Sequence, residues 1–404
     1  MDTLKLAWRN VWRNPRRSGV TIAATSLALF VMIFYSGLVS GYLSGMERNV
    51  IDVEVGDAQI YAEGYRKRPS LYTKIDDPDA LLGRLDGAGF KGSARLLGNG
   101  LAAAGDNSAG ILLRGLDPER DAAVSKVNTQ ITSGAWLDPA AQSEVVVGKR
   151  LAKTLGVGVG DELVVLSQAA DGSTANDLYK VRGVLGPVSD PVDRATVFMN
   201  EDAFRELMVF PEGAHQVLVR KPAELPLPEA TAEIGALAPS LEAKSWKQIM
   251  PVVASMLDTG RSAMMVMFGV VYVAIGIIVL NAMLMAVFER IREFGILKAL
   301  GVGPGGVLSL IFLETLIQTV IAILIGVAVS VPVNYYMATV GLDLASLSGM
   351  SIMGMSMDSV WRSEITTETY TQPILALTMI ILLAVIYPAM RAAFVKPLDA
   401  IHHQ

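Results

Sequence analysis

Four long apolar stretches, none containing a charged side chain, alternate with polar segments along the chain. They cover residues 18–46, 262–288, 315–342 and 369–390. A helix needs roughly 20 apolar residues to cross the hydrocarbon core of a bilayer, and each stretch meets that length. The pattern therefore predicts four membrane-spanning helices. We place them at residues 18–46, 259–288, 306–337 and 371–391, and expect the second to begin as a stalk outside the bilayer.

The region between the first two predicted spans, residues 47–258, has a different pattern. Short runs rich in β-branched and other apolar residues recur in it. We predict strands at residues 52–61, 110–114, 144–147, 162–166, 179–184, 196–199 and 216–219. A short helix is predicted over residues 148–156, because Gly156 would end it. We expect a large α/β (α+β) domain, made of a core and an inserted subdomain.

Positive charges near the predicted spans gather on one side of the membrane. They are Lys5, Arg9, Arg13, Arg16, Arg17, Arg290, Arg292, Lys298, Arg391 and Lys396. Lysine and arginine collect in cytoplasmic segments. We therefore predict a cytoplasmic N-terminal helix (residues 1–17), segment 289–301 and C-terminal tail (residues 392–404). Residues 47–258 and the loop 338–370 lie on the other side, which in a Gram-negative inner membrane is the periplasm.

Composition agrees with a membrane protein and narrows the chemistry. Apolar residues make up 52% of the chain, charged residues 18%, and mean hydropathy is +0.43. The absence of cysteine excludes thiolate metal sites and cysteine nucleophiles. His215, His402 and His403 have no ligand partners at metal spacing, so no metal site is expected. The net charge of −5 argues against nucleic-acid binding.

Two features near the N-terminus predict close contacts. Leu4, Trp8, Val11 and Trp12 would share one face of an amphipathic helix at the membrane surface. The first span then ends in two rows of small residues, one of serines and one of glycines. They are Ser36, Ser40 and Ser44, beside Gly37, Gly41 and Gly45. Such rows let helices approach closely in lipid. The seam lies either within the subunit or against a second subunit.

The segment 289–301 is a charged amphipathic helix between two membrane spans. We expect its contacts with a partner to come from Glu289, Arg290, Ile291, Arg292, Glu293, Phe294, Gly295, Leu297 and Lys298. The alternative is a turn helix resting at the lipid headgroups. The glycine cluster that follows, residues 301–306, lacks the Lys-Ser/Thr of a phosphate-binding loop, and no such loop occurs elsewhere in the sequence. We therefore expect no catalytic residues on this chain.

Four segments carry a family resemblance. They are residues 292–301 (REFGILKALG), 387–400 (YPAMRAAFVKPLDA), 7–17 (AWRNVWRNPRR) and 144–161 (EVVVGKRLAKTLGVGVGD). With these four segments in their order along the chain, the protein resembles permease subunits of the superfamily that includes MacB-type exporters, lipoprotein-releasing Lol permeases and FtsX. The resemblance implies four spans, a large exterior domain between the first two, and a cytosolic ATPase bound at the loop between the second and third.

The resemblance also implies a function, mechanotransmission. ATP and Mg²⁺ would be bound by a separate ATPase dimer, and the chain itself would need no cofactor. The permease would pair with a second, identical or related, permease subunit and contact membrane lipids. We expect it to extract or release lipoproteins or other lipidated substrates, handing them to a periplasmic carrier. The alternatives are MacB-like efflux of peptides or drugs, FtsX-like control of a peptidoglycan hydrolase, and sensing or detoxification of antimicrobial peptides.

Three further candidate sites follow from the sequence. The substrate cavity or dimer seam is predicted on the outer halves of the first two spans. Its residues are Ile33, Phe34, Gly37, Ser40, Gly41, Met264, Met267, Phe268 and Val271. Glu314 is an acid inside an apolar stretch, either functional or paired with a basic residue of the preceding loop. The methionines at 350, 353, 355 and 357 suggest a flexible apolar lip in preference to a Cu(I) site.

Overall fold

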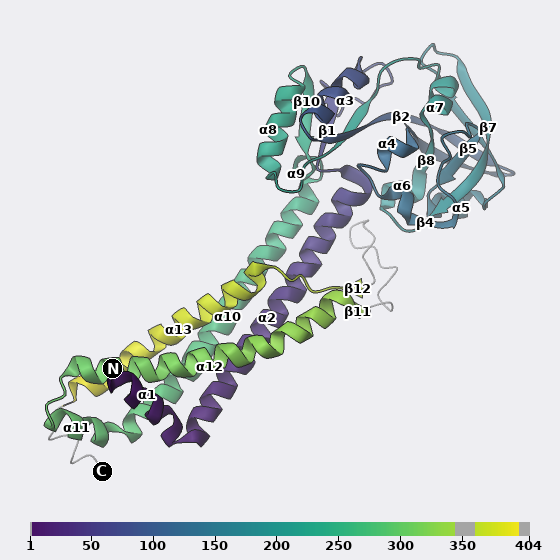
Figure 1. Ribbon diagram of the computed structural model, residues 1–404. Coiled ribbons are helices and arrows are strands. Elements are labelled where there is room, and N and C mark those ends of the chain that lie inside the picture. Colours follow the sequence, from purple (N-terminus) through teal and green to yellow (C-terminus); the bar gives the residue numbers. More distant parts are fainter. Residues whose placement is uncertain (1, 344–359, 396–404) are drawn as a thin grey trace. The chain divides into compact units, whose positions relative to one another are not determined.

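The computed structural model describes residues 2–343 and 360–395 and divides the chain into two compact units (Figure 1). A helical unit contains the described residues up to Ser44 and those in 258–343 and 360–395. The exterior unit, residues 45–257, contains a ten-stranded sheet. The predicted methionine-rich lip, Lys396 and the C-terminal histidines lie outside the described residues.

The helical unit is built from four long apolar helices and two short ones. Its helices are α1 (Asp2–Arg13), α2 (Pro15–Val50), α10 (Pro251–Glu289), α11 (Ile291–Ala299), α12 (Pro304–Thr339) and α13 (Thr367–Phe394). Among the described residues, four helices are long and apolar enough to cross a membrane, namely α2, α10, α12 and α13. This confirms the predicted fold class, a membrane protein with four spanning helices. Helix α10 begins at Pro251, earlier than the predicted residue 259.

Buried rows at a spacing of four residues hold these helices together. Helix α10 contributes Ile275, Val279, Met283 and Val287, and α13 contributes Leu377, Ile381, Val385 and Ala389. Residues four apart lie on one helix face, so each row forms a continuous seam. The other faces of α10 and α13 carry exposed apolar side chains, as helices in lipid do. A two-stranded hairpin, β11 (Leu342–Asp343) with β12 (Val360–Trp361), precedes α13.

The exterior unit alternates strands with short helices. Its strands are β1 (Ala58–Ala62), β2 (Lys91–Ala104), β3 (Asn107–Leu116), β4 (Ile131–Gly134), β5 (Glu144–Val147), β6 (Glu162–Gln168), β7 (Thr174–Leu185), β8 (Thr196–Asn200), β9 (Gln216–Arg220) and β10 (Leu241–Ser245). Its α-helices are α3 (Pro78–Gly87), α4 (Pro118–Asp121), α5 (Lys149–Leu155), α6 (Asp190–Ala195), α7 (Glu201–Met208), α8 (Leu227–Leu237) and α9 (Trp246–Ile249). A π-helical turn (Ile51–Val55) and a 3₁₀ turn (Val127–Gln130) complete it.

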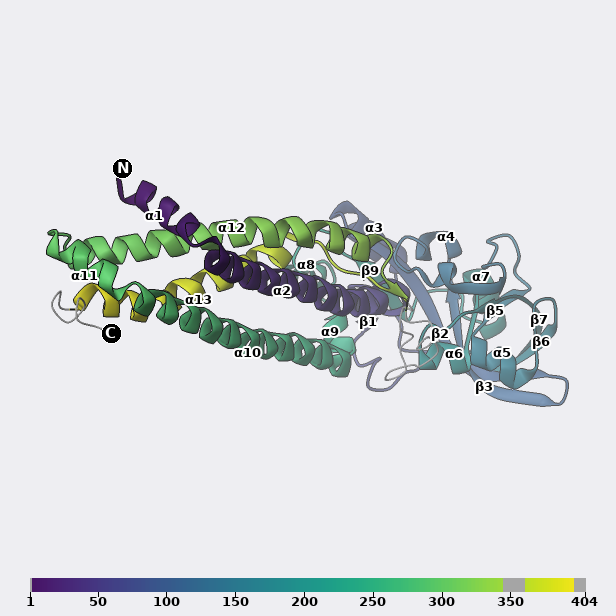
Figure 2. The same cartoon turned by 90° about the horizontal axis from the view of Figure 1, so that it is seen from below.

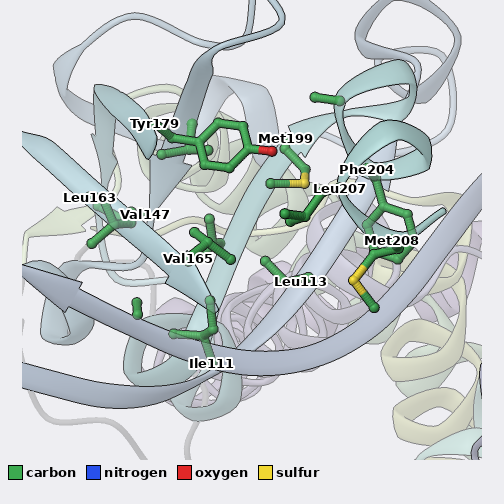
Figure 3. Packing of buried hydrophobic residues seen from close by; sticks show 14 of the residues in the cluster. Ile111, Leu113, Val147, Leu163, Val165, Tyr179, Met199, Phe204, Leu207 and Met208 are labelled. Carbon is green, nitrogen blue, oxygen red and sulfur yellow. The ribbon is translucent and has the colours of Figure 1, made fainter. Parts of the chain in front are cut away.

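The strands form one mixed sheet in the order β10-β1-β9-β2-β3-β8-β5-β7-β4, with β6 pairing β2 and β7. Three hydrophobic clusters cover it, and one of them lies around Val146, Leu185 and Phe198. A second joins β1 and β9 to α3 and α8, and its residues come from the first and last parts of the segment 45–257. The third lies among β2, β3 and β5–β8 with α5 and α7, where Figure 3 shows Phe204, Leu207 and Met208 of α7 beside Leu113 and Ile111 of β3. The middle of the segment thus has its own core.

Most predicted strands are present, and the failures have physical reasons. Residues 51–55 continue the first helix as a π-helical turn, so the strand predicted from residue 52 begins only at Ala58. Strand β2 was not predicted, because its glycines break the apolar pattern. Those glycines are required by packing: a Cβ at Gly98 or at Gly115 of β3 would press against the ring of Phe204. The predicted helix end at Gly156 is correct, with φ of 72°.

Candidate functional site

The charged segment after α10 forms a separate short helix. Glu289 ends α10, Arg290 caps the N-terminus of α11, and α11 ends before Leu300. Gly301 follows at φ of 94°, a conformation that favours glycine, and Pro304 is the first residue of α12. The glycine cluster therefore serves as the break between α11 and α12.

One face of α11 is buried in the helical unit. Phe294 is 2% exposed and belongs to the same core as the rows of α10 and α13, and Leu297 packs against that core. Gly295 is buried as well. Of the residues predicted to contact a partner, Phe294 and Gly295 are thus buried within this chain, and Leu297 is half-buried. Each side of a short helix can face only one way, and the core of this chain already occupies that side.

The opposite face of α11 is exposed and was largely missed by sequence reasoning. It carries Arg292, Ile296 (48% exposed) and Leu300 (78% exposed), spaced by four residues. Val302 is also exposed. Arg292 makes no hydrogen bond or ion pair with another described residue. The signal was available in the sequence: positions 292, 296 and 300 fall on one helical row.

A closed ring of polar contacts joins α11 to α1 and α12. Arg290 Nη1 donates to Glu314 Oε2 at 2.6 Å, and Arg290 Nε donates to Glu293 Oε2 at 3.0 Å. Asn10 Nδ2 of α1 donates to Glu314 Oε1 at 2.5 Å, and Arg13 of α1 forms an ion pair with Glu293. Two carboxylates are therefore each held both from α1 and from Arg290. The side chains of Arg290 and Glu314 are 13% and 12% exposed, whereas Arg13 and Glu293 are open to solvent.

The electrostatics of this ring favour its charged form. Partial burial acts to raise the pKa of Glu293, but hydrogen bonds from Arg13 and Arg290 outweigh burial and lower that pKa. Burial likewise opposes the charge on Arg290, and the bonds to Glu314 and Glu293 outweigh it, raising the pKa of Arg290. The ring sits beside a cavity of about 20 Å³, lined by Thr21, Gln318 and Phe294 among others, which has room for one water.

Two further predicted contact residues have partners inside the chain. Lys298 Nζ donates to the carbonyl oxygens of Ala393 (2.7 Å) and Val395 (2.6 Å), and so caps the C-terminal end of α13. Glu314 pairs with Arg290, the loop partner that the structural interpretation of this intramembrane acid expects. Lys298 therefore fixes α11 to α13, as Arg290 fixes it to α12.

The N-terminal helix α1 packs along the start of α12 (Figures 1 and 2). Ala7 and Val11 are fully buried, four residues apart. Trp8 and Trp12 are about half exposed and form an edge-to-face pair with ring centroids 6.0 Å apart. Of the predicted apolar face, Val11 is therefore buried within this chain, whereas Leu4 and the two tryptophans stay exposed.

The glycine row of the first span makes its contact within this chain. Gly37 O accepts a hydrogen bond from Glu364 N–H at 2.9 Å. A Cβ at Gly37 would overlap Ser363, and one at Gly41 would overlap the carbonyl oxygen of Arg362. Of the two interpretations of this seam, the structure shows the one within the subunit for these two glycines.

Comparison with known proteins adds to this geometry. The MacB-like periplasmic core domain matches residues 18–237, and the FtsX-like permease C-terminal domain matches residues 265–397. The lipoprotein-releasing system transmembrane protein LolC of Xylella fastidiosa (strain Temecula1) is 22% identical over 315 residues, covering 74% of this chain and 75% of that protein. The uncharacterized ABC transporter permease YknZ of Bacillus subtilis (strain 168) is 30% identical over 129 residues, covering 32% of this chain and 28% of YknZ.

The chain belongs to the FtsX/MacB-type family of ABC transporter permeases. This confirms the resemblance drawn from the four sequence segments. Among solved structures, the periplasmic region of MacB from Actinobacillus actinomycetemcomitans matches with a TM-score of 0.37 at 12% identity, covering 49% of this chain and 92% of that one. Members of the family work with a cytosolic ATPase.

Of the remaining candidate residues of this permease, Met267 and Phe268 of α10 contact α2. The ring of Tyr35 packs edge-to-face on Phe268 with centroids 5.6 Å apart, and its hydroxyl contacts Met267 Sδ at 2.9 Å. Ile33 is fully buried in the core of the helical unit. Phe34, Ser40, Met264, Phe268 and Val271 are half-buried.

The most exposed apolar face of α10 differs from the predicted one. It carries Met265, Val266, Val270 and Val273, next to the predicted Met267. Of the predicted residues of α10, Phe268 and Val271 pack against the chain's own core. Ile33, Gly37 and Gly41 also face inward, so they do not line an open cavity in this subunit.

Proposed function

We propose that this permease transmits force from a cytosolic ATPase dimer to its exterior unit. The observation that carries the proposal is the two-sided nature of α11. Its inner side is fixed to three neighbours by the Phe294 core, the Arg290 ring and the Lys298 cap. Its outer side presents Arg292, which pairs with no other described residue, among exposed Ile296 and Leu300. A helix held firmly inside and open outside is suited to receive a partner and pass on its movement.

The orientation we propose puts α11 and both termini in the cytoplasm of the inner membrane. Basic residues support it, because α1, the start of α2 and α11 carry most of the positive charge close to the spans. The exterior unit then lies in the periplasm, as the name of the matched core domain indicates. ATP and Mg²⁺ would be bound by the partner ATPase, since this sequence contains no phosphate-binding loop.

We further propose that two permease subunits form the membrane unit. The exposed apolar face of α10, with Met265, Val266 and Val270, is available to lipid, to a second permease or to an acyl chain between them. Among the residues of the predicted cavity, we propose that Met267 and Phe34 lie nearest to such an acyl chain.

The substrate class we favour is a lipoprotein or another lipidated molecule, released to a periplasmic carrier. The support is the alignment with LolC, which spans about three quarters of both proteins. The alignment with YknZ covers only 28% of that protein, so it gives less support to another substrate class. An apolar, methionine-bearing face on α10 suits an acyl chain, because thioether side chains adapt to irregular apolar surfaces.

Reconstitution tests this function. The permease, its ATPase and any second permease from the same operon are placed in liposomes with a fluorescent triacylated lipopeptide. We expect ATP-dependent transfer of the lipopeptide to an added soluble acceptor. Transfer of a water-soluble peptide but not of the lipopeptide would instead favour efflux, and ATP hydrolysis without transfer of either would favour a regulatory role.

A further inference from the structure

The route from α11 into the rest of the permease has two branches. Helix α10 is joined to α11 by the single residue Arg290, so it follows α11 through the backbone. Helix α2 lies far from α11 in sequence. It is joined to α1 by the single residue Asn14, and it runs as one continuous helix from Pro15 to Val50. Whatever holds α1 to α11 therefore also ties α2 to α11.

The polar ring is that connection. Asn10 and Arg13 lie one turn apart on α1, and each reaches a different carboxylate, on α12 and α11 respectively. Both carboxylates share Arg290 at the start of α11. Because the ring closes, moving α11 away from α1 must break the Arg13–Glu293 pair and also one of the bonds at Glu314. The planar guanidinium of Arg290 can hold two carboxylates at once, which lysine cannot do in the same way.

We propose that Arg290 is a positioning residue that makes α1, α11 and the start of α12 move as one body, so that α2 is a second transmission rod beside α10. The inference rests on the proposed function of α11 as the ATPase contact. It gives different roles to two arginines two residues apart. Arg292 contacts the ATPase, and Arg290 couples the movement of α11 to α1 and α12. Burial supports this division, since the side chain of Arg290 is only 13% exposed whereas Arg292 is exposed.

Spin-label distances test the ring in the full-length permease. The chain has no cysteine, so Leu4→Cys and Ala299→Cys, both at exposed positions outside the proposed ATPase contact, give a single labelled pair on α1 and the end of α11. In nanodiscs without the ATPase, we expect one narrow distance, and we expect Arg290→Met to lose it. The matched control Arg292→Gln should retain it. A distribution as narrow in Arg290→Met as in the parent would overturn the proposal.

A second variant covers the case in which Arg290→Met does not fold. Asn10→Leu combined with Arg13→Gln removes only the α1 side of the ring and leaves the Arg290–Glu314 pair in place. It should also lose the narrow distance. With the ATPase bound and vanadate trapping the closed state, the parent distance should stay unchanged. A shift of that distance on trapping would show that α1 does not move with α11, and would also overturn the proposal.

The two hypotheses fail in different ways. If α11 does not bind the ATPase, Arg292→Glu leaves complex formation intact, while the distances in the permease alone still report on the ring. If the ring proposal is correct, Arg290→Met and the α1 variant keep the bound ATPase and its ATP turnover, yet lower the amount of lipopeptide transferred per ATP. Arg290→Lys should restore part of that ratio, because it keeps one charge contact.

Discussion

The guanidinium of Arg290 lies 2.6 Å from the carboxylate of Glu314, joining the start of α11 to a membrane-spanning helix. In the sequence these residues stand apart, one in a charged segment and the other in an apolar run. Together they show that the charged segment is anchored to the spans and does not rest loosely at their ends. The consequences for stability and coupling can be measured.

Replacing Glu314 with Gln should destabilise the helical unit. It leaves the largely buried Arg290 with only the solvent-exposed Glu293 as a charged partner. Loss of one member of a buried pair costs up to about 3–5 kcal/mol, and we expect about 1–3 kcal/mol here because the pair is not fully enclosed. Thermal unfolding in detergent measures it, with Arg292→Gln as a control that should have little effect. Normal stability together with lost transport would give Glu314 a direct functional role.

The outward face of α11 should control affinity for the ATPase. Arg292→Glu and Leu300→Ser should each weaken the complex about tenfold or more, since each alters an exposed position that we place in the interface. Phe294→Ala should act differently, because it opens the core and lowers stability by about 3 kcal/mol. Binding of purified ATPase to nanodisc-held variants separates the two effects. Unchanged affinity in both outward variants would remove α11 from the interface.

The glycine seam of α2 predicts a sharp contrast between neighbours. Gly41→Ala should lower the melting temperature, because the added methyl group would overlap the carbonyl oxygen of Arg362. Gly45→Ala should be neutral or slightly stabilising, since no atom lies within 4 Å of its added Cβ and alanine favours helix. Equal melting temperatures for the two variants would show that the 362–364 segment does not pack on α2.

A buried ion pair should dominate the stability of the exterior unit. Arg95 Nε and Nη2 each donate to Asp121 at 2.8 Å, and both side chains are 2% exposed. Asp121→Ala should cost about 3–5 kcal/mol, because it leaves a buried charge unpaired. The exposed pair of Arg120 with Asp86 is the matched control, and Asp86→Ala should cost less than about 1 kcal/mol. Denaturant-dependent proteolysis of the exterior unit in the intact protein measures the loss of stability in both variants.

His215 should make the exterior unit sensitive to acid. Burial lowers the pKa of His215 to about 4, and its Nδ1 accepts the N–H of Leu97 at 3.0 Å. The unfolded chain binds this proton near the ordinary value of 6.5, so its contribution to stability is complete above that pH and is lost as pH falls toward 4. The loss amounts to about 3 kcal/mol.

Unfolding of the full-length protein at several pH values between 7 and 4 measures this effect. The variant His215→Gln lacks the titrating ring and should show a flatter pH dependence over that range. An equally steep dependence in the variant would assign the acid sensitivity to other groups.

The sequence predicted the membrane spans and most strands because both depend on local pattern. Charge-free stretches mark α2, α10, α12 and α13, and short β-branched runs mark β5 and β8. Strand β2 was missed, because its glycines fit against distant residues, as Gly98 does against Phe204, and no local pattern shows these partners. Local signals also located α11 but not its orientation.

The candidate site shows the same division. Glu289–Lys298 was correctly placed between two spans, yet the sequence could not tell that Arg290 and Lys298 turn inward. Their partners, Glu314 and the end of α13, come from chain segments far away. The outward row of Arg292, Ile296 and Leu300 follows from helical spacing once the buried side is known.

Site-specific crosslinking tests the central claim, that α11 delivers the force of the ATPase through its outward face. Single cysteines in this cysteine-free chain at positions 296 and 300 are exposed, and one at position 294 on the same helix is buried. In the assembled complex, Ile296→Cys and Leu300→Cys should crosslink to the ATPase, and Phe294→Cys should not. An intact complex with no crosslink from positions 296 and 300 would contradict the account.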